Sequence, residues 1–146
     1  MKASALCILI LIGSVALVSG VSASILEQTG KYTVEPAGKL HLPTITPLVS
    51  STIAQGEIDV YYRTISSGTP SMVTDLYWGN PANSLSLTIV APDATLGPYY
   101  DSADGTVNGR IALSVSSPSG LTPGTWTFYI RGHSVSGSQA YSFMTY

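Results

Sequence analysis

Short segments that alternate apolar and polar residues dominate the chain from about Thr46 to its end. Apolar and more polar residues alternate with a period of two in residues 85–89, 111–115 and 126–130, and again in residues 141–143. Because successive side chains of a strand point to opposite faces, a period of two predicts strands with one buried and one polar face. No stretch after residue 23 shows sustained helical periodicity.

Turn-forming residues separate these segments. Asp104-Gly105, Asn108-Gly109 and Pro123-Gly124 are examples, and such pairs reverse the chain at low conformational cost. Seven or eight short strands joined by turns indicate an all-β fold, an antiparallel β-sandwich of jelly-roll type, over residues 47–146. The positions with apolar parity that we expect in its core include Trp126, Phe128, Tyr141 and Phe143.

The N-terminus has the pattern of a secretory signal peptide. Lys2 precedes an apolar run over residues 5–18, and Val21-Ser22-Ala23 places small residues at a cleavage site. We therefore predict a signal peptide over residues 1–23, cleaved after Ala23, followed by an extended leader over residues 24–46. The alternative is an uncleaved membrane anchor, which needs about 20 apolar residues. The protein is expected to be secreted or at the cell surface.

Composition narrows the possible functions. Of the 146 residues only 10% are charged and the net charge is −2, so there is no basic surface to bind nucleic acid. The single cysteine, Cys7, lies within the predicted signal peptide. The mature chain therefore has no disulfide, no thiolate zinc site and no cysteine nucleophile.

No catalytic motif is evident, so we expect a protein that is not an enzyme. His41 and His133 are the two histidines and neither belongs to a metal-ligating spacing. Residues 132–136 resemble the Gly-x-Ser-x-Gly nucleophile elbow but lack its last glycine. We expect His133 to lie exposed in a loop.

An acidic loop is the candidate metal site. Asp101, Asp104 and Asn108 offer the oxygen ligands that Ca²⁺ prefers. The stronger alternative is turn chemistry, in which aspartate accepts hydrogen bonds from nearby backbone N–H groups. A pair of catalytic carboxylates is a third and weaker interpretation.

Tyrosines that lie in loops or on the polar parity of strands are the candidate ligand-binding residues: Tyr77, Tyr99, Tyr100 and Tyr129. Exposed tyrosine rings can stack on sugars or anchor a protein interface. The alternative is cross-strand packing on an exposed sheet face.

Three segments together resemble the bacterial and archaeal pre-peptidase C-terminal domain. Residues 56–61 are similar to its Gly-x-x-Asp-x-Tyr strand, residues 76–93 to its paired strands ending in a Pro-Asp turn, and residues 123–126 to its Pro-Gly-Thr-Tyr strand. Departures from the family pattern include Arg63, where an inward aromatic is usual, and residues 47–52, which lack the acids of calcium-binding members.

The resemblance implies a secreted β-sandwich without catalytic machinery, with a binding, spacing or secretion role. We interpret Asp59 of the Gly-x-x-Asp-x-Tyr motif as structural: it accepts hydrogen bonds while Tyr61, on the same strand face, packs.

The leading hypothesis is a secreted, non-catalytic module with a binding or cell-surface role. One alternative is a carbohydrate-binding module that uses the exposed tyrosines. The other is a structural subunit of an extracellular layer or filament, in which residues 24–46 exchange as a strand. The expected partner is an extracellular protein or polysaccharide, with membrane contact only through an uncleaved signal segment.

Overall fold

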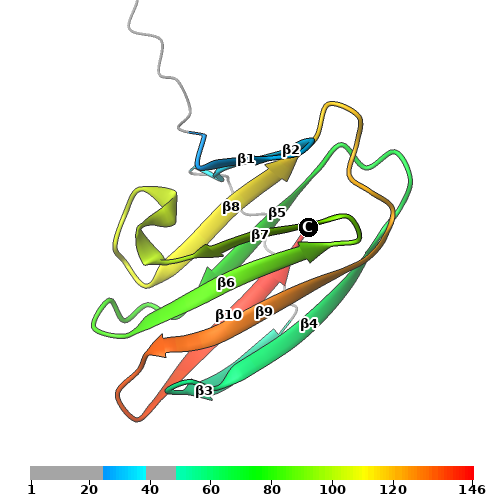
Figure 1. Cartoon of the computed structure of the whole chain (residues 1–146). Helices are drawn as coiled ribbons and strands as arrows, with labels where there is room; N and C mark the ends of the chain where they lie inside the picture. The colour runs from blue at the N-terminus through cyan, green and yellow to red at the C-terminus, as the bar shows by residue number, and fades with distance from the viewer. Residues whose placement is uncertain (1–24, 39–48) are drawn as a thin grey trace, which may run out of the picture.

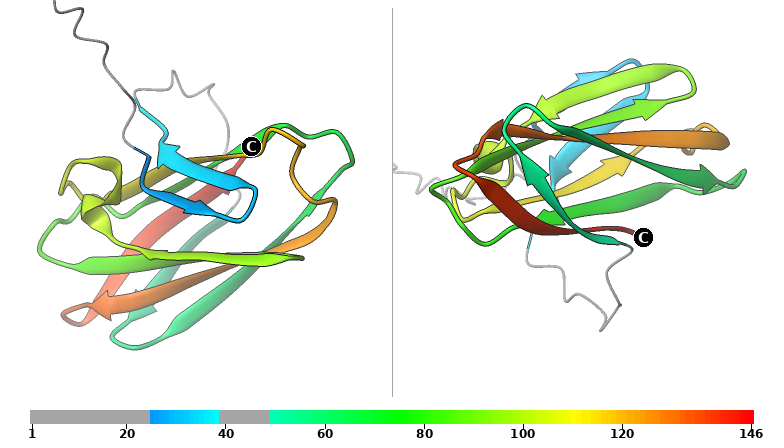
Figure 2. Two further views of the ribbon diagram at one scale, coloured as in Figure 1. Left: turned by 45° about the horizontal axis from the view of Figure 1, so that its top comes forward. Right: turned by 90° about the horizontal axis from the view of Figure 1, so that it is seen from below.

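Two antiparallel β-sheets pack face to face (Figures 1 and 2). A computed structural model describes residues 25–38 and 49–146 of the chain, so the predicted signal peptide lies outside the described residues. The strand order across the six-stranded sheet is β1(Glu27–Thr29), β2(Tyr32–Pro36), β8(Arg110–Ser116), β5(Ser71–Tyr77), β10(Ser138–Thr145), β3(Val49–Ala54). The four-stranded sheet runs β4(Ile58–Ile65), β9(Gly124–Ser134), β6(Ser84–Ala91), β7(Ala94–Tyr99). A short 3₁₀ helix, η1(Asp101–Asp104), links β7 to β8. The predicted β-sandwich is confirmed.

The core lies between the two sheets and follows the predicted alternation. All four aromatic residues expected there are buried: Trp126, Phe128, Tyr141 and Phe143. Phe128 of the four-stranded sheet packs against Phe143 of the six-stranded sheet, with ring centroids 5.3 Å apart. These rings therefore join the two layers.

The predicted count of seven or eight strands is right: residues 49–146, the described part of the predicted domain, contain eight, β3 to β10. The described part of the predicted extended leader contains β1 and β2, and β2 pairs along β8 over the extended stretch at residues 32–34. Tyr32 and Val34 of β2 are buried in the core. Residues 27–36 therefore belong to the sandwich, although a strand of only five residues beside polar and proline-containing sequence carries a weak signal.

The β1–β2 hairpin closes one edge of the sandwich, as the left view of Figure 2 shows. Glu27 of β1 accepts hydrogen bonds from the Tyr99 hydroxyl at 2.5 Å and the Gly97 backbone N–H at 3.0 Å. Both donors belong to β7, the edge strand of the other sheet. At the opposite edge, β3 continues directly into β4, so the chain itself joins the two sheets.

No helix in the described part of the chain is long and apolar enough to cross a membrane.

Candidate functional site

The outer face of the four-stranded sheet carries an unusual set of exposed side chains. Across β4, β9 and β6 the register aligns three outward rows: Ile58–Arg131–Ser86, Val60–Tyr129–Thr88 and Tyr62–Thr127–Val90. Each row combines an apolar or aromatic side chain with a hydroxyl-bearing one. Neighbouring rows lie about 7 Å apart, since two residues separate them along a strand.

Apolar side chains that would ordinarily be buried are exposed on this face. Tyr62 is 66% exposed, Ile58 52%, Tyr129 39% and Val60 37%. Three of the four come from β4, the edge strand. The inward face of β4 is the more polar one, because it carries Asp59, Tyr61 and Arg63 ahead of buried Ile65. The usual arrangement of an apolar inner face and a polar outer face is thus reversed along most of this strand.

A surface cavity of about 310 Å³ lies on this outer face. Its walls include the rings of Tyr100 and Tyr129, the guanidinium-bearing Arg131, the imidazole of His133 and the hydroxyls of Ser86 and Thr88. Ile58, Val90 and Pro98 complete the lining. An apolar cavity with a few convergent polar groups is the usual form of a ligand-binding site.

The Tyr100 ring is positioned by a contact across the sheet. Tyr100 follows β7, and its ring meets the His133 imidazole of β9 edge to face, with centroids 4.8 Å apart. This geometry is a favourable one for two aromatic rings. His133 is exposed as predicted, but it lies within β9 and not in a loop.

The four candidate tyrosines separate into three environments. Tyr100 and Tyr129 line the same cavity on the four-stranded sheet. Tyr77 is 53% exposed but lies on the six-stranded sheet, beside a different cavity. Tyr99 is only 6% exposed, so the expectation that it is available to a ligand is wrong.

A shift in strand register explains the burial of Tyr99. Leu96 pairs with Ile89 and Tyr99 pairs with Leu87, so three residues of β7 span two residues of β6. The extra residue turns both Leu96 and Tyr99 toward the core, although simple alternation would place them on opposite faces. Burial, together with the hydrogen bond to Glu27, raises the pKa of the Tyr99 hydroxyl above its ordinary value.

The hydrogen bonds of the acidic loop are those of a turn in which an aspartate accepts from backbone N–H groups. Oδ1 of Asp101 accepts hydrogen bonds from the backbone N–H groups of Asn108, Gly109 and Arg110, all at 3.0–3.1 Å. Oδ2 also accepts from Gly109, and the Asp101 side chain is buried. The carboxylate thus organises the chain reversal between η1 and β8, much as an N-terminal cap does.

Asp104 and Asn108 line a second cavity, of about 340 Å³, together with Arg110. Asp104 accepts backbone hydrogen bonds from Thr106 at 3.2 Å and Ala112 at 3.2 Å. Burial raises the pKa of Asp104, which the two backbone donors only partly offset. A cation placed here would also meet the Arg110 guanidinium. The described residues contain no cluster of three or more His, Cys, Asp or Glu side chains suited to a metal, and the calcium site stays a prediction.

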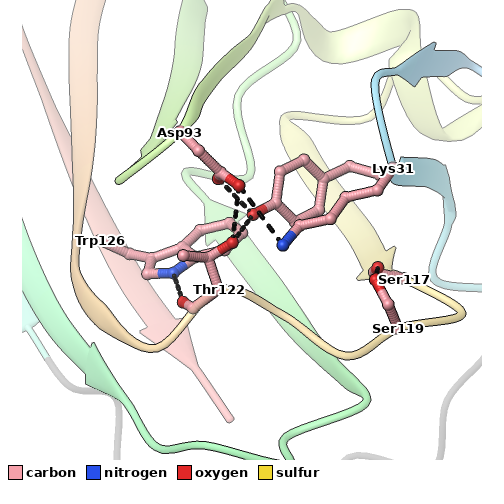
Figure 3. Close-up of polar contacts among 7 residues, drawn as sticks. Lys31, Asp93, Ser117, Ser119, Thr122 and Trp126 are labelled. Carbon is pink, nitrogen blue, oxygen red and sulfur yellow. Dashed lines mark hydrogen bonds and ion pairs between the residues drawn. The ribbon is translucent and has the colours of Figure 1, made fainter.

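A polar cluster at the end of the sandwich anchors the N-terminal hairpin (Figure 3). The Tyr32 hydroxyl lies 2.5 Å from Oδ1 of Asp93 and 2.7 Å from the Thr122 hydroxyl, and Lys31 pairs with Asp93 at 3.3 Å. Thr122 donates to Oδ2 of Asp93 at 2.7 Å, and its backbone carbonyl accepts from the Trp126 indole at 2.9 Å. The cluster joins three stretches of the chain, residues 31–32, residue 93 and residues 122–126, through contacts among its own members, so we assign it to stability.

The Gly-x-x-Asp-x-Tyr motif also forms internal contacts. The Tyr141 hydroxyl donates to Asp59 at 2.5 Å and lies 2.5 Å from the Tyr61 hydroxyl. Tyr61 stacks on Phe143 with ring centroids 5.5 Å apart. These contacts are those expected of a structural Asp59 and a packed Tyr61. Arg63 donates to the Thr145 hydroxyl from the same strand face.

Sequence reasoning missed the β4 contribution to the outer face. Ile58, Val60 and Tyr62 share one parity, and that signal was available in the sequence. The signal was overlooked because the alternate positions of the strand carry Asp59 and Tyr61, which resemble the family motif and lie on the inner face.

No protein-family model and no curated protein matches the chain.

Proposed function

We propose that this protein is a secreted or cell-surface, non-catalytic β-sandwich module that binds carbohydrate on the outer face of its four-stranded sheet. One observation carries the proposal: two exposed tyrosine rings share a cavity with hydroxyl-bearing side chains, on a sheet face that also exposes Ile58 and Val60. A sugar presents apolar C–H groups on its ring face and hydroxyls at its rim. The cavity offers tyrosine rings to the C–H groups and hydroxyl-bearing side chains to the sugar hydroxyls.

Tyrosine suits such a surface. Its ring supplies rigid apolar area with few rotatable bonds, and its hydroxyl adds a hydrogen-bonding group at the water boundary. Tyr129 is held in the middle row of the face by its cross-strand neighbours Val60 and Thr88. Tyr100 is held by His133. Because both rings already have packing partners, they lose less conformational freedom when a ligand binds, and the entropic cost of binding is smaller.

The extracellular location rests on the signal-peptide pattern before Ala23 and on the cysteine-free composition after it. The resemblance to the pre-peptidase C-terminal domain supports a binding role outside the cell. The non-catalytic assignment rests on the absence of a catalytic motif from the sequence and on the internal engagement of Asp59, Asp101 and Asp104.

A glycan array probed with residues 24–146 tests the binding proposal. We expect hits that are lost in Tyr129→Ala and kept in Tyr77→Ala, which removes a more exposed tyrosine from the other sheet. An array without hits, or hits that Tyr129→Ala leaves intact, would refute a carbohydrate site on this face.

Hydrolase assays on broad peptide, ester and glycan substrates test the non-catalytic assignment. We expect no turnover. Reproducible turnover that one substitution abolishes would show the assignment to be wrong.

A further inference from the structure

The charge of the cavity points to the class of sugar. The described residues contain four basic side chains, and three have partners: Lys31 pairs with Asp93, Arg110 with Asp75, and Arg63 with the Thr145 hydroxyl. Arg131 has no ion pair and no side-chain hydrogen bond within that part of the chain, and it lies exposed in the cavity wall. An unpaired guanidinium is the group that most often binds carboxylate, sulfate or phosphate.

The acidic side chains all lie elsewhere. The chain has eight, every one of them among the described residues, and none lines this cavity. Seven accept hydrogen bonds or pair with a cation within the fold: Glu27, Glu57, Asp59, Asp75, Asp93, Asp101 and Asp104. The eighth, Glu35, lies in β2 of the other sheet. An acidic protein thus keeps one sheet face free of carboxylates, around a cation.

We propose that the cavity binds an acidic polysaccharide, whose anionic group pairs with Arg131 while a sugar ring packs on Tyr129 and Tyr100. The inference rests on the proposed carbohydrate function and adds the charge of the ligand. The outward neighbours of Arg131 in its row are Ile58 and Ser86, so the guanidinium has one apolar and one hydroxyl flank. Neither neighbour carries a charge that would neutralise the guanidinium.

The position of Arg131 along β9 supports simultaneous contact. Tyr129, Arg131 and His133 are successive outward residues of the same strand, so the charge lies between two ring-bearing positions. The step from Tyr129 to Arg131 is about 7 Å, and His133 follows at the irregularity where β9 has one extra residue relative to β6. An extended chain of sugars running along β9 would meet a ring, the guanidinium and the Tyr100–His133 pair in order.

Matched polymers test the charge directly. Binding of residues 24–146 to polygalacturonate is compared, by titration calorimetry, with binding to the fully methyl-esterified polymer, which keeps the backbone and removes the charge. We expect at least a tenfold loss of affinity on esterification, and about the same loss for Arg131→Gln on the acidic polymer, as a charge-assisted hydrogen bond predicts. Arg131→Lys should recover part of the loss, because it restores charge but not the planar fork.

Dextran sulfate and dextran form a second matched pair, which distinguishes a sulfate from a carboxylate as the anionic group. Selective binding to either acidic polymer over its neutral partner supports the inference and identifies the source of the charge. Tyr77→Ala is the control in each titration and should bind as the unaltered protein does. Urea unfolding of each variant verifies that it is folded.

Two outcomes would overturn the inference and they differ in meaning. If neutral and acidic polymers bind equally and Arg131→Gln has no effect, while Tyr129→Ala abolishes binding, the carbohydrate function stands and the charge selectivity is wrong. If no glycan of any charge binds, both proposals fail.

Discussion

Gly132 lies where β9 passes beneath the turn between β3 and β4. Its backbone N–H donates to the Glu57 carbonyl at 3.1 Å, and its carbonyl accepts from Gly56 at 2.8 Å. A Cβ atom added at this residue would lie 2.0 Å from the backbone oxygen of Ala54. Because the obstructing atom belongs to the backbone, no side-chain rotation can relieve the contact.

Gly132→Ala should therefore destabilise the fold by about 3 kcal/mol, as overpacking against fixed backbone does. Gly137→Ala is the comparison, since its Cβ would meet nothing within 4 Å and its cost comes from a φ of +72°. That conformational cost is about 1 kcal/mol. Urea unfolding midpoints of the two variants measure the difference, and equal midpoints would contradict the close approach at Gly132.

Tyr32 joins an apolar contact to a polar one. Its ring meets Trp126 edge to face at 5.4 Å, and its hydroxyl reaches Asp93 and Thr122. Tyr32→Phe keeps the ring and removes the hydroxyl, so we expect a loss of about 1–2 kcal/mol in unfolding free energy. Thermal or urea unfolding measures it. A loss as large as that of Tyr32→Ala would mean that the ring contact contributes nothing.

At the scale of elements, the β1–β2 hairpin is held by two carboxylates. Burial acts to raise the pKa of Glu27, but hydrogen bonds from Thr29, Tyr99 and Gly97 outweigh it and lower the pKa. Hydrogen bonds from Tyr32 and Thr122 lower the pKa of Asp93. In both cases the folded state favours the ionised form.

The hairpin should consequently become less stable in acid. A carboxylate with a lowered pKa stabilises the fold above its ordinary value, 4.5 for Glu27 and 3.8 for Asp93, and this stabilisation is lost as the pH falls through the lowered value. We expect the melting temperature to fall between about pH 5 and pH 2, and to fall less steeply in a Glu27→Gln, Asp93→Asn double variant.

Asp104 is present in both proteins of that comparison. Its raised pKa acts in the opposite sense, because protonation on acidification relieves the cost of its buried charge. Because Asp104 titrates in both proteins, its contribution cancels when one pH profile is subtracted from the other. Parallel profiles would show that Glu27 and Asp93 do not anchor the hairpin through their charge.

The same hairpin decides where the folding unit begins. A chain that starts at Pro47 retains every strand from β3 onward but loses Tyr32 and Val34, which are 1% and 0% exposed in the intact protein. Burial of two such side chains contributes about 3–6 kcal/mol. We expect this truncated chain to unfold at much lower urea concentration than residues 24–146, and an unchanged midpoint would return the boundary to residue 47.

At the scale of the whole molecule, the two-layer architecture was predictable because period-two alternation and turn residues are local signals. The core positions of Trp126 and Phe143 follow from parity alone, because the alternation holds along β9 as far as Gly132 and along β10 from Ser138 to Phe143. Alternation gave the wrong face for Tyr99, because the register of β7 on β6 shifts between Leu96 and Tyr99. Gly97-Pro98, directly before Tyr99, is a pair typical of an irregular strand, but it does not tell which face Tyr99 takes after the register shift.

The candidate site was predictable only in part, for a related reason. Tyr100 and Tyr129 are 29 residues apart in sequence (129 − 100), and their common cavity depends on β7 and β9 both lying beside β6. Strand order is set by packing over the whole sandwich. Arg131 was visible in the sequence, but its lack of a partner is a property of eight acidic side chains distributed over the entire fold.

The pairing of β2 with β8 has a consequence for the order of folding. Thr33 of β2 pairs with Ser116 of β8, so β2 waits for a partner synthesised 83 residues later (116 − 33). Such distant contacts close slowly. Until then Tyr32 and Val34 remain exposed on a nascent chain. The N-terminal hairpin is therefore expected to dock only after β8 has been made. The edge strand β3 waits longer still, because its partner β10 lies 84 to 94 residues further along the chain (138 − 54 and 143 − 49).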